Sequence, residues 1–229
     1  MISYFCKNTG MQIVPTNDGS DTLYVAAIDE HYHSVFGAIT ESEWVFIGSG
    51  LAYSQRPGDL SVFEVGFGTG LNALLACNWA ITHNRSLCYH TIEKFPIPPD
   101  IVGRLNFTAC LPAIPEATEL FHTIHLSPWN EKVNLHPCFS MQKIQGDMTV
   151  YNPDTYFDVV FFDAFSPDRQ PEMWTAEIFR KLYEHMHTGG VLATYCVKGL
   201  VKRRLKEAGF AIEKLPGPPG KREILRAVK

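Results

Sequence analysis

The chain of 229 residues is long enough for one full-size domain, or for a domain with a modest extension. Its hydrophobic content of 45% and charged content of 19% are typical of a soluble globular protein, and its net charge of −4 argues against a general nucleic-acid binder. No apolar stretch approaches the 18 residues that a membrane span needs, so we expect no membrane association.

Targeting and metal signals are weak along the whole sequence. The first 20 residues lack the basic and apolar regions of a signal peptide. The six cysteines never form a C-x-x-C pair, which argues against a zinc cluster and a disulfide framework. Three histidine pairs, at 31/33, 122/125 and 185/187, lack a third ligand at a usual spacing. We therefore expect a cytoplasmic protein with reduced thiols and no metal.

The order of predicted elements indicates the fold class. Residues 1–59 are predicted to form an N-terminal extension of short β segments, and residues 60–229 a domain in which strands and helices alternate. We expect strands at 60–65, 88–92, near 141–145, 157–163, 191–195, 211–214 and 223–227. We expect helices at 71–83, about 100–109, 116–122, 172–187 and 199–208, with a loop-rich region at 110–140. This pattern predicts an α/β, Rossmann-like fold with a seven-stranded, mostly parallel sheet that ends in an antiparallel hairpin across residues 216–220.

A glycine-rich turn follows the first strand of this domain: Glu64-Val-Gly66-Phe-Gly68-Thr-Gly70. Glycines let backbone amides approach a ligand closely, with the N-terminus of the next helix behind them. Dinucleotide sites usually show G-x-G-x-x-G. The spacing E-x-G-x-G-x-G instead resembles the first motif of class I S-adenosylmethionine-dependent methyltransferases. Similar turns also occur with no ligand, which leaves a purely structural role open.

Glu93 follows the second strand of the domain, 23 residues beyond Gly70. In doubly wound folds a carboxylate at this point accepts hydrogen bonds from ribose hydroxyls. The alternative is a solvated charge at the end of the strand, paired with Lys94. We interpret Glu93 as a ligand residue because the glycine turn lies at the expected distance upstream.

Two further carboxylates follow later strands. Asp163 ends the apolar strand 157–163 and should face the crevice beyond the carboxyl ends of the sheet. A carboxylate there can bind an attacking amine, aim its lone pair at a methyl carbon and accept its proton. The alternative is that Asp163 caps the following turn. Asp147 lies where such folds often contact an adenine amino group, or is a loop residue with no ligand.

Positive charge is concentrated after residue 197. Residues 198–229 hold ten Lys or Arg against three Glu, about +7, whereas the first 197 residues carry about −11. This split suggests a polyanionic partner. The loop 216–220 should place Lys221 and Arg222 at the mouth of the ligand site, with residues 202–204 on the preceding helix. The alternative is that Lys221 and Arg222 only pair with Glu223 and its neighbours to close the hairpin.

Several longer motifs are more discriminating than the glycine turn. They are FEVGFGTGLNALLA, IEKFP, FFDAFSPDRQPEMW, GGVLATY, VKRRLKEAGF and LPGPPGKREILRA, with DGSDTLY and YHSVFGAITESEWVFIGSGL nearer the N-terminus. Taken along the chain, these motifs are colinear over residues 17–228 with the methyltransferase half of the bacterial MnmC family of tRNA-modification enzymes, which the chain resembles.

The resemblance implies methyl transfer from S-adenosylmethionine to the primary amine of 5-aminomethyl-2-thiouridine at the wobble position, in the anticodon region of tRNA. It makes Asp163 the catalytic carboxylate. The cofactor would be bound by Glu64, Gly66, Gly68, Gly70, Asn72, Glu93 and Asp147. We expect the substrate to be contacted by Tyr32, His33, Ser34, Glu41, Lys221 and Arg222. The segment Tyr32-His33-Ser34 should shape the base pocket, with its aromatic ring able to stack on an extruded uridine.

One departure from the family matters, and two other functions stay open. Many family members carry a fused FAD-dependent oxidoreductase domain, for which this sequence has no room, so we expect a stand-alone methyltransferase and a separate oxidoreductase acting on the same nucleoside. One alternative is an aminopropyltransferase of the spermidine synthase type, whose glycine and Asp-rich motifs differ. The other is a catalytically silent protein of the same fold that binds RNA or a protein partner.

Overall fold

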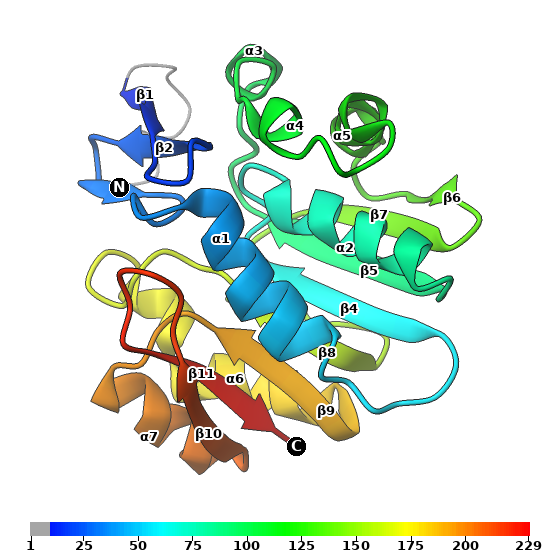
Figure 1. The fold of residues 1–229 in the computed structure, drawn as a ribbon. Helices are drawn as coiled ribbons and strands as arrows, with labels where there is room; N and C mark the ends of the chain where they lie inside the picture. Colours follow the sequence, from blue (N-terminus) through cyan, green and yellow to red (C-terminus); the bar gives the residue numbers. More distant parts are fainter. Residues whose placement is uncertain (1–9) are drawn as a thin grey trace.

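One large sheet forms the centre of the molecule. The structure is a computed structural model that describes residues 10–229, so residues 1–9 of the predicted extension lie outside it (Figure 1). The strands of the sheet lie in the order β10-β11-β9-β8-β4-β5-β7-β6. They are β4 (Leu60–Val65), β5 (Leu87–Glu93), β6 (Lys132–His136), β7 (Phe139–Gln145), β8 (Phe157–Phe162), β9 (Met186–Thr194), β10 (Ala211–Pro216) and β11 (Glu223–Val228).

The sheet is mostly parallel, as predicted. β4 lies between β5 and β8, and the pairs β5–β7 and β8–β9 are also parallel. β11 runs antiparallel to both β9 and β10, which confirms the terminal hairpin. The sheet has eight strands rather than seven, because β6 adds an antiparallel edge to β7. The short, polar sequence of β6 gives little strand signal, so the prediction of a loop at 132–136 was wrong.

Most predicted helices are present, with two corrections. The helices after β4 are α2 (Leu71–Thr82), α3 (Pro99–Val102), α4 (Phe107–Cys110), α5 (Ala117–Leu126), the 3₁₀ helix η2 (Pro171–Trp174), α6 (Ala176–Glu184) and α7 (Gly199–Ala208). The helix expected at 100–109 is divided, because Asn106 instead bonds the N-terminal segment through Asp21 N (2.8 Å) and Gly19 O (2.9 Å). The helix expected at 172–187 begins anew at Thr175, whose hydroxyl caps α6, and its last residues belong to β9.

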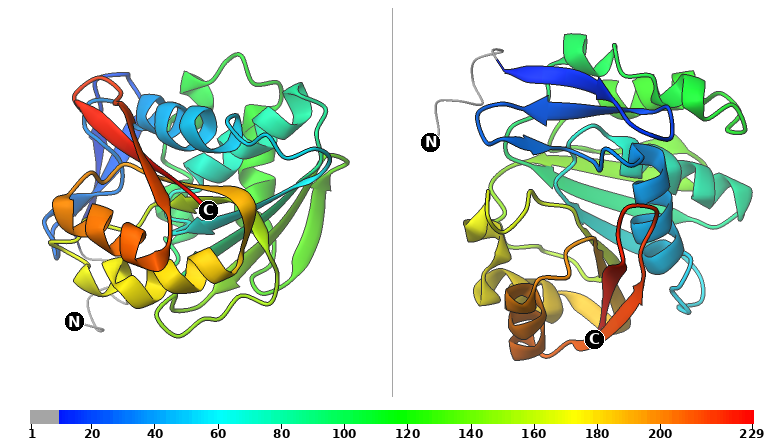
Figure 2. Two further views of the ribbon diagram at one scale, coloured as in Figure 1. Left: turned by 90° about the horizontal axis from the view of Figure 1, so that it is seen from below. Right: turned by 60° about the vertical axis from the view of Figure 1, so that its left-hand side comes forward.

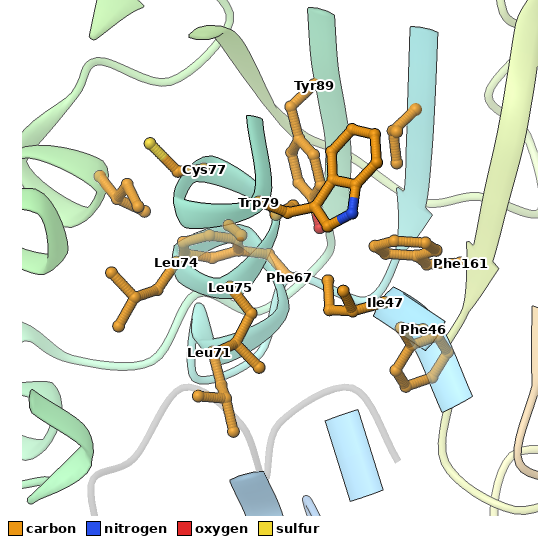
Figure 3. Close-up of a cluster of buried hydrophobic side chains, with 14 of the residues drawn as sticks. Phe46, Ile47, Phe67, Leu71, Leu74, Leu75, Cys77, Trp79, Tyr89 and Phe161 are labelled. Carbon is orange, nitrogen blue, oxygen red and sulfur yellow. The ribbon is translucent and has the colours of Figure 1, made fainter. Parts of the chain in front are cut away.

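Helices cover both faces of the sheet (Figures 1 and 2). α2 and α5 lie on one face together with η1 (Glu43–Leu51), and α6 and α7 lie on the other. Alternate residues of each strand therefore enter different cores: Val62 packs on the α2 side and Phe63 on the α6 side. Figure 3 shows the first core, in which Phe46 and Ile47 of η1 lie near Phe161 of β8.

The N-terminal segment is only partly made of strands. β1 (Met11–Pro15), β2 (Asp21–Val25) and β3 (Glu30–His31) form a three-stranded antiparallel sheet. The next residues form α1 (Ala38–Ser42), which continues into the π-helix η1, so the prediction of β segments was wrong for residues 38–51. Figure 2 shows the β10–β11 hairpin beside this helix, where the Trp44 indole donates to Pro216 O at 2.9 Å. The division of the chain at residue 59 stays a prediction.

Candidate functional site

A cavity of about 460 Å³ lies at the carboxyl ends of β4, β5 and β8. Residues of the N-terminal segment and of the β10–β11 loop complete its lining. Ligands of open α/β sheets bind at this edge. The predicted site residues that line it are Tyr32, His33, Ser34, Glu41, Gly66, Gly68, Asn72, Glu93, Asp147, Asp163 and Lys221. Glu64, Gly70 and Arg222 are predicted site residues that do not line it.

The glycine turn after β4 has a backbone that favours glycine. Gly66, Gly68 and Gly70 have φ of +95°, +48° and +75°. A Cβ atom on Gly66 would lie 2.7 Å from Asp163 O, and one on Gly68 would lie 3.0 Å from the Tyr32 ring. The turn can therefore pass close to the loop after β8 and still present its backbone to the cavity.

Glu93 is fixed by this turn. Its two carboxylate oxygens accept Gly68 N at 3.1 Å and Phe95 N at 2.9 Å. Burial raises the pKa of Glu93, and these backbone hydrogen bonds oppose the rise. The alternative pairing with Lys94 is absent, because Lys94 donates to Asp147 at 2.6 Å. Glu93 is therefore held at the edge of the cavity with oxygens able to accept ligand hydroxyls.

Asp147 is positioned by its own loop as well as by Lys94. Its second oxygen accepts Thr149 N at 2.9 Å and Thr149 Oγ1 at 2.7 Å. Burial works against its charge, but the hydrogen bonds from Lys94 and Thr149 lower the pKa of Asp147. An ionised carboxylate at this place can accept a ligand N–H group.

Glu64 lies below the cavity in the sheet. It is fully buried, and its Oε2 accepts the Thr91 hydroxyl at 2.7 Å. Burial raises the pKa of Glu64 to about 8, which favours the neutral acid at pH 7. The Asn72 and Tyr89 side chains lie close to the Glu64 carboxyl, and with Thr91 they oppose the rise in its pKa. The structure therefore places Glu64 behind the residues that line the cavity.

Asp163 lies at the point where β8 ends. Asn72 Nδ2, from the first turn of α2, donates to Asp163 Oδ2 at 2.8 Å. Burial and the nearby Glu41 carboxylate raise the pKa of Asp163 to about 7, while Asn72 and Lys221 oppose the rise. The next helix, η2, begins only at Pro171, and α6 is capped by Thr175, so Asp163 is not a helix cap. A carboxylate with this pKa can exchange a proton near neutral pH.

The predicted site residues of the N-terminal segment have different partners in the structure. The Tyr32 ring packs against Gly68 and makes an edge contact with Phe165, with ring centroids 4.9 Å apart. His33 shares a 2.8 Å hydrogen bond with Thr69, and burial lowers its pKa to about 4. Ser34 donates its backbone N–H to Glu41 at 2.8 Å. His33 is therefore a neutral residue that fixes the glycine turn.

The two basic residues after the β10–β11 loop have different surroundings. Lys221 forms a salt bridge with Glu41 and lines the cavity. Arg222 is exposed. Glu223 pairs with Lys214 at 3.3 Å, so neither Lys221 nor Arg222 closes the hairpin through Glu223.

The lining residues that were not predicted from the sequence include three aromatic residues: Tyr195, Phe36 and Phe165. Tyr195 follows β9, and its hydroxyl donates to Ala164 O at 2.9 Å, beside Asp163. The rule that ligands lie at strand ends could have found it. Phe36 is 47% exposed at the cavity and lies against Gly220. Phe165 follows β8 and makes an edge contact with the Tyr32 ring. Both Phe36 and Phe165 lie within the longer family motifs, which could have marked them.

Residues 10–229 contain neither a metal-binding cluster nor a membrane-spanning helix. In this part of the chain no group of three or more His, Cys, Asp or Glu side chains could hold a metal ion. No helix within the same residues is long and apolar enough to cross a membrane.

Comparison with protein families and sequences adds a chemical class to this geometry. Residues 106–229 match a family model described as S-adenosyl-L-methionine-dependent methyltransferase. The tRNA 5-methylaminomethyl-2-thiouridine biosynthesis bifunctional protein MnmC of Pseudomonas putida (strain GB-1) is 31% identical over 86% of this chain and 32% of its own length. The protein of the same name from Magnetococcus marinus is 34% identical over 91% of this chain and 32% of its own length. The chain thus spans about a third of these relatives.

Solved structures give a consistent result. The crystal structure of MNMC2 from Aquifex aeolicus superposes with a TM-score of 0.76 and 26% identity, over 97% of this chain and 71% of that chain. Spermidine synthase from Thermotoga maritima superposes with a TM-score of 0.54 and 12% identity, over 96% of this chain and 69% of that chain. The second likeness concerns the fold alone.

Proposed function

This chain belongs to the family of S-adenosyl-L-methionine-dependent methyltransferases, and we propose that it methylates the aminomethyl group of 5-aminomethyl-2-thiouridine at the wobble position of tRNA. The observation that carries the proposal is Asp163, held by Asn72 in the cavity beside the glycine turn. The names of the MnmC relatives and the similarity to MNMC2 support the same substrate.

The described residues fit S-adenosylmethionine. The turn at Gly68 leaves the backbone open to the cavity, and Glu93 stands at the end of β5 where a ribose is bound in such folds. We assign cofactor contacts to Gly66, Gly68 and Glu93, with Asp147 for the adenine amino group. We assign Glu64, Asn72 and Gly70 the task of supporting these residues from behind or beside the turn.

Asp163 would carry the chemistry at the acceptor. When bound, S-adenosylmethionine supplies a methyl group on a positively charged sulfur. Asp163 would orient the neutral amine and, as the nitrogen gains the methyl group, take up the proton that the nitrogen loses. Asn72 would fix the carboxylate for this task. Tyr32, His33 and Ser34 would form the wall that separates the acceptor from the cofactor.

A contact surface for tRNA is part of the same proposal. Phe36 presents an exposed ring at the cavity, on which an extruded uridine could stack. Arg222 and, on α7, Arg203 are exposed cations for the anticodon backbone. A cytoplasmic location follows from a tRNA substrate. The MnmC relatives are named bifunctional, so we also propose that a separate FAD-dependent oxidoreductase prepares the same nucleoside.

The test is incubation of the protein with labelled S-adenosylmethionine and tRNA from a strain that lacks this methylation, followed by nucleoside analysis. We expect label in 5-methylaminomethyl-2-thiouridine, and none when tRNA already carries that modification. A parallel incubation with decarboxylated S-adenosylmethionine and a polyamine covers the spermidine synthase alternative, which aminopropyl transfer to the polyamine would support. Cofactor binding with no transfer to either substrate would support a catalytically silent protein.

A further inference from the structure

Lys221 is placed inside the cavity, where a residue that contacts tRNA phosphates would have little access. Its side chain is 27% exposed and forms a salt bridge with the Glu41 carboxylate, which is 8% exposed. Its Nζ also lies 4.3 Å from the centroid of the Tyr195 ring. Lys221 thus has a carboxylate and an aromatic face as partners before any substrate is bound.

The partner of Lys221 is itself fixed. Glu41 Oε2 accepts Ser34 N at 2.8 Å, while Oε1 accepts Lys221. The pair joins α1 to the β10–β11 loop across 180 positions of the sequence. An ion pair with this degree of burial holds two distant segments in one geometry, and loss of either partner leaves an uncompensated charge.

Asp163 lies in the field of this pair. The groups that act on Asp163 are Glu41 from α1, Lys221 from the hairpin loop and, by a hydrogen bond, Asn72 from α2. Asp163 in turn raises the pKa of Glu64 from β4, Tyr89 from β5 and Tyr195 after β9. Of these groups Lys221 carries the one positive charge. Burial and Glu41 disfavour the ionised form of Asp163, and Lys221 favours it.

We propose that Lys221 is a positioning residue, whose ammonium balances the charges of Glu41 and Asp163 so that Asp163 can serve as an anionic acceptor for the amine proton. This inference rests on the proposed function, which gives Asp163 its proton-accepting role. Glu41, Asp163 and Lys221 line the same cavity, and Lys221 is paired with Glu41. Without the cation, two carboxylates share this cavity, and their repulsion favours the protonated form of Asp163.

The first test measures Asp163 directly in the free protein. The carboxyl ¹³C signal of Asp163, assigned by its loss in Asp163→Asn, is titrated in wild type and in Lys221→Met. We expect the midpoint to rise by about one pH unit in Lys221→Met. Lys221→Arg should retain the wild-type midpoint. Glu41→Gln/Lys221→Met, which removes both charges, should return the midpoint toward wild type. Lys214→Met is the matched control on the same hairpin, because Lys214 pairs with Glu223 and is 52% exposed.

The second test uses the reaction. At saturating cofactor and tRNA, the acid limb of the pH profile of kcat should move upward in Lys221→Met by the same amount as the titration. If Lys221 instead contacted a tRNA phosphate, Lys221→Met would raise the KM for tRNA and leave the acid limb unchanged. The salt dependence of tRNA binding would then fall by about one released counterion.

These outcomes separate the inference from the proposed function. A midpoint of Asp163 that is unchanged or lowered in Lys221→Met overturns the inference, whatever the activity. A raised midpoint in a protein that methylates no tRNA supports the charge balance and contradicts the proposed substrate. If Lys221→Met does not fold, Glu41→Gln/Lys221→Met and Lys221→Arg still test the inference. A titration midpoint of Asp163 that differs from wild type by about one pH unit in either variant contradicts the proposed charge balance.

Discussion

The two halves of the cavity are built in different ways. The proposed cofactor half consists of residues 64–71 with Glu93 and Asp147, and it offers a ligand mainly backbone amides and strand-end carboxylates of neighbouring strands. The proposed acceptor half consists of Asp163, Asn72, Glu41 and Lys221, whose side chains come from the end of β8, α2, α1 and the hairpin loop. One half depends on local backbone geometry, and the other depends on docking of distant segments.

This difference predicts which substitutions affect cofactor affinity and which affect turnover. A strand–turn–helix segment keeps its geometry as long as the local chain is folded. A constellation of side chains from four elements depends on every one of them. We therefore expect changes in the acceptor half to reduce turnover and changes in the cofactor half to reduce affinity.

The largest expected effect tests the acceptor half alone. Asp163→Asn keeps the shape of the side chain and an oxygen for Asn72, but it removes the proton acceptor. We expect kcat to fall by about 10²–10⁴ with unchanged affinity for S-adenosylmethionine. Single-turnover kinetics and calorimetry measure the two quantities. Asp168→Asn, on the same loop but 73% exposed, is the control and should retain turnover.

The same variant has a pH signature. Since the pKa of Asp163 is about 7, it is ionised and active above that pH, and wild-type kcat should fall as the pH drops through 7. The residual activity of Asp163→Asn should lack this limb. A limb near pH 7 that persists in the variant would assign proton acceptance to another group.

The next effect tests the cofactor half. Gly68→Leu forces a side chain onto a backbone with φ of +48° and toward the Tyr32 ring. We expect affinity for S-adenosylmethionine to fall by about 100-fold or more, because the side chain also enters the space of the ligand. Gly58→Leu is the matched control, since Gly58 has φ of +77° with open space around it. Equal loss of affinity in both would mean that strain, rather than the site, is responsible.

A smaller effect is expected at Glu93. In Glu93→Gln one of the two backbone N–H groups, of Gly68 or Phe95, faces an amide NH₂ instead of an oxygen. We expect cofactor affinity to fall about tenfold with little change in kcat at saturation. Calorimetry gives the affinity, and Glu119→Gln on α5 serves as control. A fall in kcat alone would place Glu93 in the acceptor half and break the comparison.

The smallest effect lies outside both halves. Arg222→Glu should raise the KM for tRNA by about two- to fivefold and weaken its salt dependence, with no change in the KM for S-adenosylmethionine. Lys132→Glu on β6, at the opposite edge of the sheet from β10, is the control of equal charge change. Equal KM values for tRNA in Arg222→Glu and wild type would remove Arg222 from the contact surface.

Sequence predicted the strand ends that carry the proposed cofactor half. The glycine spacing and the carboxylates that follow strands are local signals, and the strands that carry them begin and end close to the predicted residues. Asp163 was found by the same rule. Its hydrogen bond with Asn72 was not, because it depends on how α2 meets the end of β8.

The acceptor half was harder to predict for physical reasons. Residues 38–51 contain β-branched residues and glycines that disfavour helix, yet they form α1 and η1 because their apolar side chains are buried against the sheet. Gly50 permits this close packing, since a Cβ there would lie 3.2 Å from Phe161 and Ala193. The pair Glu41–Lys221 links positions 180 residues apart, and no local pattern marks such a pair.

The Glu41–Lys221 pair also sets an order in time. A ribosome makes Glu41 and Asp163 well before Lys221, so the nascent chain holds both carboxylates before the cation that balances them exists. The cofactor half, by contrast, is complete once β4 to β8 have been made. On the proposed roles, a chain whose hairpin has not yet docked would have the cofactor half without the cation that balances the acceptor half.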